Sequence, residues 1–460
     1  MVLTRLGNFP ALETRRPVAK AFSTLPWALA LDELAHAKNQ TITLGNQPRV
    51  LTNFQNELWK TLNTGASVAL SAPTSVGNSF VLELYLTSLF DAESQSVAYV
   101  VPTRALITQV SSDLAAIFVQ HKKRAPEIIT VPPKQGLPLP SNAIYVMTQE
   151  RLHLTMQARL DFSVKKLVVD EAHSISEGAR GILLQSVVEQ ILERNPDMQV
   201  LFASPTTRNL DCFGRLFRRP DILPQATRDP TVSQNFLILK RTSSGAVSIS
   251  SARRTGPPLP ISEVPNQFKL RTRIEKLAHL PLLLCRDQPN LIYANGADEA
   301  EDIALLLVKQ LKKHTPNSRC LALSKLAKES VHPSYILSEC VLHGVGFHYA
   351  NIPTNLRQEV EFAFADGALR YLVCTSTLLQ GVNLPAKNIF MLKPTKGQNT
   401  PLKPADFWNL AGRAGRLRRE FQGNIFLIDY DEWGEQLVQK PRDVEIAPAI
   451  QQPSQPLPDN

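Results

Sequence analysis

The feature that most constrains the fold is an alternation of short β-branched runs with longer helical patterns, beginning near residue 50. The strands expected in the first half are Ser67–Ser71, Val97–Val101, Ile144–Met147, Lys166–Asp170 and Val200–Ala203. Helical patterns between several of them cover Ser79–Phe90, Ala105–Gln120 and Gly181–Arg194. This alternation predicts an α/β fold with a parallel sheet covered on both faces.

A second alternating series follows a proline-rich stretch that holds one strand-like piece, Val232–Lys240. The elements expected in this series are Asn290–Ala294, Ala297–Lys313, Tyr371–Cys374, Asn388–Leu392 and Asn424–Ile428. Two α/β domains in tandem are therefore predicted. The expected boundaries are an N-terminal extension over 1–49, a first domain over 50–220, a linker over 221–265, a second domain over 266–440 and a disordered tail over 441–460.

Composition is that of a globular protein, with 43% hydrophobic and 20% charged residues. The formal net charge is +9. A basic balance favours polyanionic partners such as nucleic acid, because each neutralised phosphate releases counterions. It is equally compatible with a merely basic soluble protein, so charge alone does not decide.

The five cysteines form no Cys-x-x-Cys pair and no zinc-like cluster, which is typical of reduced thiols in the cytoplasm. The longest apolar runs, such as Leu280–Cys285, are too short to cross a bilayer. We therefore expect a cytoplasmic protein without a membrane segment.

The segment Ser71–Ser79 follows the first expected strand and opens a helix. A loop of small residues there can aim backbone N–H groups at phosphate oxygens, and Ser79 carries the hydroxyl expected to ligate Mg²⁺. The preceding position, where a phosphate-binding lysine is expected, holds Asn78. By itself the segment is weak evidence, because small-residue loops between strand and helix are common.

Asp170 and Glu171 end an apolar run, Leu167–Val169, that has the pattern of a buried strand. Ligands gather at the carboxyl ends of parallel strands. There Asp170 would hold Mg²⁺ through water, and Glu171 would orient and deprotonate an attacking water. The alternative is a strand end whose acids are simply solvated.

Arg413 and Arg416 lie three residues apart in Gly412–Arg416, on one face of an expected helix. Two guanidinium groups so placed could stabilise the charge of a γ-phosphate in the transition state. The alternative is a basic surface helix, although the flanking glycines favour a close backbone approach.

These three segments, in this order, resemble the DEAD/DEAH-box helicases of superfamily two, within their Ski-type branch. Further segments are similar to motifs of that family, from the adenine-reading glutamine motif to motif V: Phe54-Gln55, Val101–Leu106, Met147–Arg151, Ser204–Thr206, Ile292–Ala294, Gly346–Ala350 with Arg357 and Glu361, and Thr375–Pro385. The resemblance covers about residues 50–430.

The resemblance implies two tandem RecA-like domains with a cleft between them for ATP and Mg²⁺. The residues it implies for catalysis are Asp170, Glu171, His173, Arg413 and Arg416. Those implied for the nucleotide are Gln55, Thr74, Gly77, Asn78, Ser79, Gly381 and Asn383, with Ser79 and Asp170 at the metal. Those implied for the nucleic-acid backbone are Thr103, Arg104, Thr148, Thr375 and Thr377.

Two departures from the family pattern bear on activity. Asn78 has no cationic head, so ATP hydrolysis is expected to be impaired, whether that residue is natural or introduced. The chain ends at Asn460, which leaves no room for the winged-helix and ratchet domains of Ski-type enzymes. A partner protein is expected to supply them.

The leading hypothesis is an ATP-dependent motor on single-stranded or partly duplex nucleic acid, with DNA and RNA both open. A rival is a helicase-like module that binds nucleic acid or a protein without hydrolysing ATP. A third is a phosphate-loop ATPase unrelated to nucleic acid, in which the segments around Thr103, Thr148 and Thr375 would have no role.

Overall fold

The computed structural model divides the chain into two compact units, each described by itself. The first unit comprises Met1–Thr231 and Asp443–Asn460, and the second comprises Val232–Arg442. The residues that the structure describes are 26–28, 31, 35, 38–44, 47–73, 78–90, 94–120, 125–205, 207–227, 232–311, 315–379, 384, 386–397, 400–415, 422–443 and 445–451.

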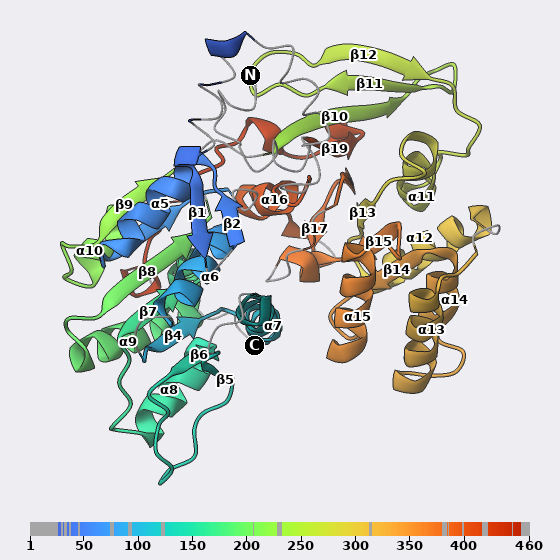
Figure 1. Cartoon of the computed structure of the whole chain (residues 1–460). Helices are drawn as coiled ribbons and strands as arrows, with labels where there is room; N and C mark the ends of the chain where they lie inside the picture. Colours follow the sequence, from blue (N-terminus) through green and yellow to red (C-terminus); the bar gives the residue numbers. More distant parts are fainter. Residues whose placement is uncertain are drawn as a thin grey trace. The chain divides into compact units, whose positions relative to one another are not determined.

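The first unit is built on a seven-stranded sheet in which every neighbouring pair is parallel (Figure 1). In spatial order its strands are β5 (Glu127–Ile129), β6 (Ala143–Met147), β4 (Ser96–Val100), β7 (Lys166–Val169), β8 (Gln199–Ser204), β3 (Val68–Ser71) and β9 (Leu223–Ala226). A separate antiparallel pair, β1 (Thr41–Leu44) and β2 (Gln47–Val50), precedes them. The predicted parallel sheet is confirmed, with strand ends within one residue of the expected ones.

Helices cover both faces of this sheet, because alternate residues of each strand enter different cores. In β7, Leu167 and Val169 belong to one core and Val168 to the other. One core takes in helices α8 (Gln149–Ala158), α9 (Gly178–Arg194) and α10 (Asp211–Leu216). The other takes in α5 (Asn53–Asn63), α6 (Asn78–Leu89) and α7 (Arg104–Gln120).

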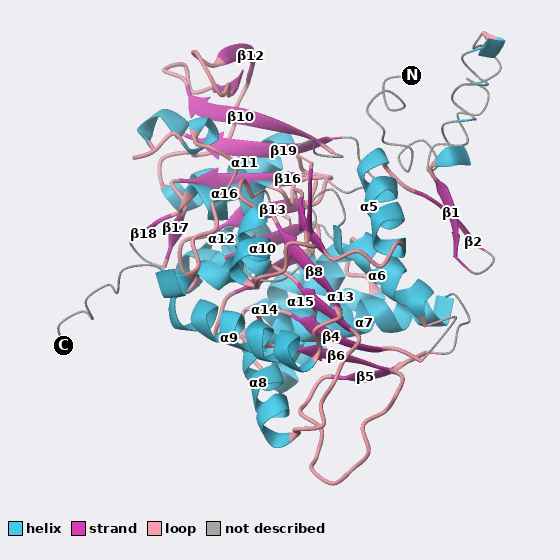
Figure 2. Cartoon of the chain, turned by 90° about the vertical axis from the view of Figure 1, so that its left-hand side faces the viewer, coloured by secondary structure: helices cyan, strands magenta, loops and turns pink. Residues whose placement is uncertain are grey.

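The second unit has an eight-stranded sheet that is parallel except at one edge (Figure 2). In spatial order its strands are β12 (Leu259–Val264), β11 (Val247–Ser251), β10 (Ser233–Arg241), β19 (Gln422–Ile428), β16 (Asn388–Leu392), β13 (Asn290–Tyr293), β15 (Tyr371–Cys374) and β14 (Val345–His348). The β10–β11 and β11–β12 pairs are antiparallel, whereas β10 pairs in parallel with β19. A short antiparallel pair, β17 (Thr395–Lys396) and β18 (Thr400–Pro401), lies outside this sheet.

Helices of the second unit share one continuous hydrophobic core with its sheet. The helices are α11 (Arg273–Leu284), α12 (Ala297–Gln310), α13 (Ser318–Ser330), α14 (Leu337–Cys340), α15 (Thr354–Ala365) and α16 (Pro404–Ala411). Short 3-10 turns complete the two units: η3 (Ala172–Ser176), η4 (Val341–His343), η5 (Ser376–Leu379), η6 (Tyr430–Glu432), η7 (Leu437–Gln439) and η8 (Ala449–Gln451).

The stretch 221–265, predicted as a linker, is divided between the two sheets. β9 extends the first sheet, and β10, β11 and β12 form the antiparallel edge of the second. The prolines that suggested a linker lie where they do little harm to strand pairing: Pro260 is in the edge strand β12, beside a register shift. One strand was expected in this stretch, and the structure has four.

The segment after the second unit returns to the first unit, where a disordered tail was predicted. Asn209 accepts a hydrogen bond from the backbone N–H of Ile446 and donates one to its carbonyl, each at 2.8 Å. Ile446 is buried in the core beside α9. Its apolar side chain and these two bonds hold residues that the many prolines nearby had suggested would be disordered.

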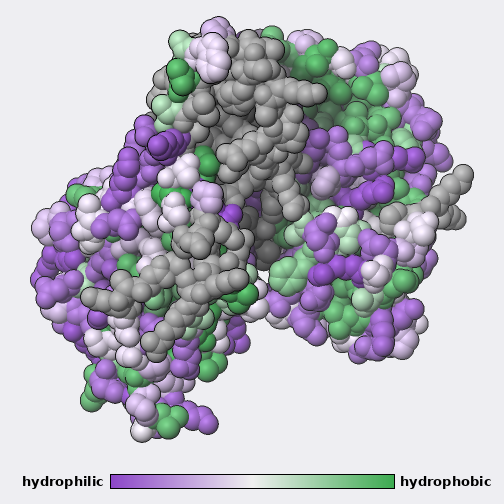
Figure 3. All heavy atoms as spheres, viewed as in Figure 1, coloured by the Kyte–Doolittle hydropathy of each residue, from purple (hydrophilic) through white to green (hydrophobic). Residues whose placement is uncertain are grey.

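On the face in view, hydrophilic and hydrophobic side chains of the first unit are interspersed (Figure 3). Its most exposed large apolar side chains, such as Leu160 and Val119, come from separate places in the fold. No described helix combines the length and the hydropathy needed to cross a bilayer. All five cysteines are buried and free of disulfides.

We predict that Gly423→Ala destabilises the second unit by roughly 1–3 kcal/mol, because it overpacks a site with no room to relax. A Cβ at Gly423 would lie 2.3 Å from the backbone carbonyl carbon of Ala414 and 2.5 Å from the nitrogen of Gly415. The measurement is denaturant unfolding. Gly434→Ala is the control, because nothing lies within 4 Å of that Cβ position. Equal stabilities of the two variants would contradict this view of the packing.

Candidate active site

The Asp170–Glu171 pair lies where β7 leaves the sheet. Asp170 still donates its backbone N–H to Val100 at 2.9 Å, so it continues the ladder with β4. Glu171 then takes a left-handed conformation with φ of 52°, and the chain turns at once into η3. A non-glycine residue in this conformation is strained, and such strain concentrates at functional positions. The turn ends the strand with two adjacent carboxylates at the sheet edge.

Each carboxylate is held by a near neighbour. Asp170 Oδ1 accepts a hydrogen bond from the Glu171 N–H at 2.9 Å, and Asp170 Oδ2 accepts one from the Tyr99 hydroxyl at 3.4 Å. Glu171 Oε2 lies 3.3 Å from Nδ1 of His173. The structure thus places the predicted residues Asp170, Glu171 and His173 together, and their catalytic role stays a prediction.

Negative charge accumulates around Asp170. Burial, followed by the charge of Glu171, raises its pKa to about 7. Glu83 on α6 is also buried, and its pKa is raised well above the ordinary value by burial and then by the charges of Asp113 and Asp170. Sequence reasoning missed Glu83, because nothing in the α6 pattern shows that it faces another acid.

This group of acids fits a divalent cation. Acids whose ionised form is disfavoured gain most from a nearby positive ion. Mg²⁺ commonly takes only one or two protein carboxylates, together with waters and phosphate oxygens. The described residues contain no cluster of three or more metal-ligating side chains.

The start of the predicted phosphate loop is fixed against the end of β8. The Ser71 hydroxyl accepts the Thr207 N–H at 2.6 Å and donates to the Pro205 carbonyl at 3.2 Å. Ser204 and Thr207 join their hydroxyls at 2.8 Å. Because β3 lies beside β8 and β8 beside β7, the loop begins at the sheet edge that carries Asp170. Thr207 was not predicted; its only sequence signal is its place after Ser204-Pro205-Thr206.

Several predicted nucleotide residues lie outside the described part of the chain: Thr74, Gly77, Gly381, Asn383 and, of the catalytic set, Arg416. The helix α6 begins at Asn78, as expected for a helix opened by the loop. The side chains of Asn78 and Ser79 are also outside the described residues.

Gln55 is buried at the third position of α5 and forms a capping box with Thr52. Its side-chain oxygen accepts the Thr52 N–H at 3.0 Å, and the Thr52 hydroxyl accepts the Gln55 N–H at 3.2 Å. This local role was not predicted. The capping box fixes the position of the side-chain carbonyl.

Thr103, Arg104 and Thr148 lie at the starts of α7 and α8, two helices on opposite faces of the sheet. Thr103 accepts the Leu106 N–H at 3.4 Å at the beginning of α7, where Arg104 is exposed. Thr148 is the N-cap of α8. These helices follow β4 and β6, adjacent strands of the same parallel sheet. The structure therefore brings these residues to the edge that also carries Asp170, with helix N-termini suited to phosphate groups.

Thr375 and Thr377 lie at the corresponding edge of the second sheet. Thr375 directly follows β15, and Thr377 lies in η5. Their hydroxyl oxygens are 3.4 Å apart, and Thr377 Oγ1 is 3.2 Å from Nδ1 of His348. His348 ends the neighbouring strand β14.

Arg413 lies in a turn rather than in the predicted helix. α16 ends at Ala411, and the next residues bridge in parallel to Ala386, which donates to the Arg413 carbonyl at 3.0 Å and accepts the Gly415 N–H at 2.7 Å. Gly415 has φ of 91°, which a helix excludes. Arg413 is therefore not on a helix, contrary to the prediction, and Arg416 lies outside the described residues.

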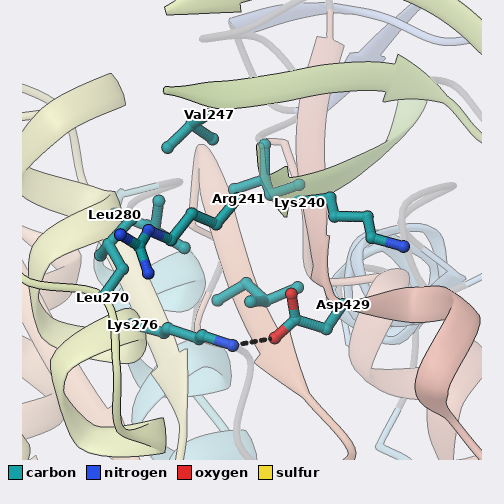
Figure 4. Close-up of a pocket in the computed structure, with 9 residues that line it drawn as sticks. Lys240, Arg241, Val247, Leu270, Lys276, Leu280 and Asp429 are labelled. Carbon is teal, nitrogen blue, oxygen red and sulfur yellow. Dashed lines mark hydrogen bonds and ion pairs between the residues drawn. The ribbon is translucent and has the colours of Figure 1, made fainter. Parts of the chain in front are cut away.

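A small hollow elsewhere in the second unit holds none of the predicted site residues (Figure 4). It is lined by Lys240, Arg241, Val247 and Leu280, among others, and closed by a 2.6 Å ion pair between Lys276 and Asp429. Its volume of about 10 Å³ admits about one water molecule, so it is not a nucleotide pocket.

Two family models match this chain, in the order of the two units. The DEAD/DEAH box helicase model matches residues 52–212, and the helicase conserved C-terminal domain model matches residues 299–418. Two RecA-like domains are thereby confirmed. The chain belongs to the DEAD/DEAH helicases of superfamily two, in their Ski-type branch.

Relatives in this branch are about a quarter identical to the chain over the aligned residues. "Helicase POLQ-like" of Caenorhabditis elegans is 26% identical over 80% of this chain and 40% of its own length. "ATP-dependent DNA helicase Hel308" of Methanocella arvoryzae is 26% identical over 81% and 50%, respectively. "Superkiller complex protein 2" of Mus musculus is 23% identical over 82% and 33%. The chain thus spans a third to a half of the length of these relatives.

The two roles of Gln55 are separable by substitution. Gln55→Glu keeps an acceptor for the Thr52 N–H but removes the amide donors expected to read adenine. We predict roughly tenfold weaker ATP binding, as for one lost hydrogen bond beside a charged ligand. Gln55→Ala loses both roles and about 1 kcal/mol of stability. Wild-type ATP affinity in Gln55→Glu, measured by calorimetry, would exclude an adenine contact.

Proposed function

We propose that this chain is the motor core of a helicase, which binds ATP with Mg²⁺ and couples its turnover to movement on, or remodelling of, a nucleic-acid strand. The observation that carries the proposal is the shared sheet edge of the first unit. The start of the phosphate loop, the Asp170–Glu171 pair and the helix starts at Thr103 and Thr148 all lie at the carboxyl ends of neighbouring parallel strands.

In this proposal the first unit holds the nucleotide. Gln55 contacts the base, Thr74, Gly77, Asn78 and Ser79 surround the phosphates, and Ser79 and Asp170 hold Mg²⁺, which would neutralise phosphate charge. Glu171 orients the attacking water and accepts a proton from it. His173, whose Nδ1 lies 3.3 Å from Oε2 of Glu171, holds that carboxylate in place. Gly381, Asn383, Arg413 and Arg416 supply the second unit's contacts, the arginines by stabilising charge as the phosphoryl group departs.

The strand is proposed to lie along the hydroxyls and the guanidinium group of five residues: Thr103, Arg104, Thr148, Thr375 and Thr377. Such groups bind phosphate and sugar without reading bases, so binding is expected to be insensitive to sequence. One of the relatives is named as a DNA helicase and another as a DNA polymerase, so single-stranded DNA is the first polymer to test, with RNA beside it.

A second candidate is favoured by Asn78 alone. Without a cation at this position, the phosphates face the acids around Asp170 with less neutralising charge. The chain would then be a clamp that binds ATP and a strand, or a partner protein, without turnover. Glu171 and Arg413 speak for the motor, because a clamp does not need a residue that orients water.

Asn78→Lys is predicted to raise kcat for ATP hydrolysis about 10²-fold or more, because it restores a preorganised positive charge at the phosphates. The gain should depend on single-stranded DNA or RNA. Asn78→Gln, which lengthens the side chain without charge, is the matched control and should gain nothing. A lysine variant that binds ATP and strand yet shows no turnover would rule out the motor and leave the clamp.

Arg104→Gln is predicted to weaken binding of single strands similarly for all sequences. Its loss of one phosphate contact should make the slope of log K against log salt concentration shallower by about 0.7. Lys165→Gln is the control: Lys165 is exposed too, but it precedes β7 at the opposite edge of the sheet. Equal slopes for wild type and Arg104→Gln would remove Arg104 from the strand site.

A further inference from the structure

A buried polar pair lies behind Thr377 in the second unit. His348, at the end of β14, is completely buried, and Glu361 on α15 is almost so. Nε2 of His348 and Oε1 of Glu361 are 3.7 Å apart. Neither atom has a hydrogen-bond partner among the described residues. Buried polar atoms that face each other without a bond are costly, so a function is expected of them.

The other ring nitrogen of His348 leads towards the surface. Nδ1 lies 3.2 Å from Oγ1 of Thr377, which is only half-buried and is itself 3.4 Å from Oγ1 of Thr375. A line of atoms thus runs from the carboxyl of Glu361, through the imidazole of His348, to the Thr377 hydroxyl. An imidazole with one proton donates at one nitrogen and accepts at the other, so it transmits the direction of a hydrogen bond.

We propose that Glu361 and His348 are positioning residues that decide whether the Thr377 hydroxyl donates its hydrogen outward, to a strand phosphate, or inward, to His348. The inference rests on the strand contact proposed for Thr377.

The outward state requires a proton on Glu361. The carboxyl O–H then donates to Nε2 of His348, and its Nδ1–H donates to Oγ1 of Thr377. The hydroxyl oxygen is satisfied as an acceptor, and its own hydrogen is free for a ligand. A phosphate oxygen, which only accepts, is the ligand that this state suits.

The inward state follows when Glu361 loses that proton. The carboxylate can only accept, so the imidazole turns its N–H to Nε2 and becomes an acceptor at Nδ1. The Thr377 hydroxyl then donates to Nδ1 and presents only lone pairs outward. Those lone pairs repel a phosphate oxygen, so strand affinity falls.

The charges around the pair allow this change near neutrality. Burial raises the pKa of Glu361 to about 7, although the charges of Arg357, on the same helix, and Arg413, after α16, act to lower it. Burial, and then the charge of Arg357, lower the pKa of His348 to about 3, so the ring stays neutral. Cys374 on β15, which also interacts with Glu361, keeps its proton because burial raises the pKa of its thiol.

Arg413 gives the pair a link to the nucleotide. While its guanidinium lies near Glu361, it favours the carboxylate and hence the inward state. An Arg413 drawn away by phosphate would let Glu361 take up a proton and turn Thr377 outward. The proposed strand contact would then strengthen when the triphosphate is engaged.

The test is the affinity for single-stranded oligodeoxynucleotide and oligoribonucleotide, measured by fluorescence anisotropy between about pH 6 and about pH 8. The wild-type chain should lose about tenfold in affinity as pH rises through the pKa of Glu361, as one charge-assisted hydrogen bond is lost. Glu361→Gln keeps a donor for His348 and cannot ionise, so its affinity should stay level. The affinity of Thr377→Val should also be independent of pH, but it should equal the weaker affinity that the wild type has at high pH.

Glu359→Gln is the matched control, because Glu359 is on the same helix but only half-buried and paired with Arg319. It removes the same charge and should follow the wild-type pH profile. A Glu361→Gln profile that falls with pH like that of the wild type would overturn the proposal. So would a wild-type profile without a fall.

Thermal unfolding separates this inference from the proposed function. A carboxyl whose pKa is raised by folding stabilises the fold less as pH rises above its ordinary value, so the unfolding midpoint of Glu361→Gln should gain on that of the wild type towards about pH 8. If neither the wild type nor any variant binds a strand but this gain is seen, the proposed function fails. The raised pKa of the buried Glu361 is then still supported. A midpoint difference that is constant with pH overturns the pair itself.

Discussion

Parallel strand register is the constraint on which the rest of this structure depends. In a parallel sheet all strands end at the same edge. Strand pairing alone therefore brings residues that are far apart in the chain to that edge. In the first unit this edge collects the phosphate-loop start after β3, Asp170 after β7 and Thr148 after β6. In the second unit it collects His348 after β14 and Thr375 after β15. The candidate functional residues lie at or just after the strand ends, and the buried apolar strands fix their positions.

Charge is distributed differently at the two edges. The first unit concentrates acids: burial and then the charge of Glu171 raise the pKa of Asp170 to about 7, and burial and then the charges of Asp113 and Asp170 raise that of Glu83. This environment favours a bound cation. The lack of positive charge at Asn78, where a lysine is expected, therefore has a larger effect. The second unit instead sets a neutral imidazole between a carboxyl and two hydroxyls, with arginines nearby. The edge in the first unit is suited to hold a metal and a triphosphate. The edge in the second unit is suited to let the charge of a carboxyl set the direction of a hydrogen bond.

The sequence predicted the parts that depend on local pattern. The strands Tyr371–Cys374 and Asn388–Leu392 have the expected bounds, because each is a short apolar run between polar turns. It did not predict the antiparallel β11 and β12, whose prolines and serines have the composition of a linker. The helix expected at Arg413 fails because Gly415 and the bridge to Ala386 impose another backbone path.

The contacts between side chains were the hardest feature to predict from the sequence. The Gln55 capping box could have been suggested by Thr52 three residues before it. The approach of Glu83 to Asp170, or of His348 to Glu361, could not, because each depends on how a helix is rotated against a sheet. The motif residues Arg357 and Glu361 were noted for their resemblance, but only the fold shows that Glu361 is buried against an imidazole.

The central claim is that ATP and a nucleic-acid strand bind to coupled sites of one motor. The most direct test is the affinity of the chain for a single strand with and without a saturating non-hydrolysable ATP analogue and Mg²⁺, since this needs no turnover. We expect roughly 5- to 150-fold coupling and the same factor for the analogue when the strand is saturating, because linkage is reciprocal. Equal strand affinities with and without the analogue, when both ligands are shown to bind, would contradict the account.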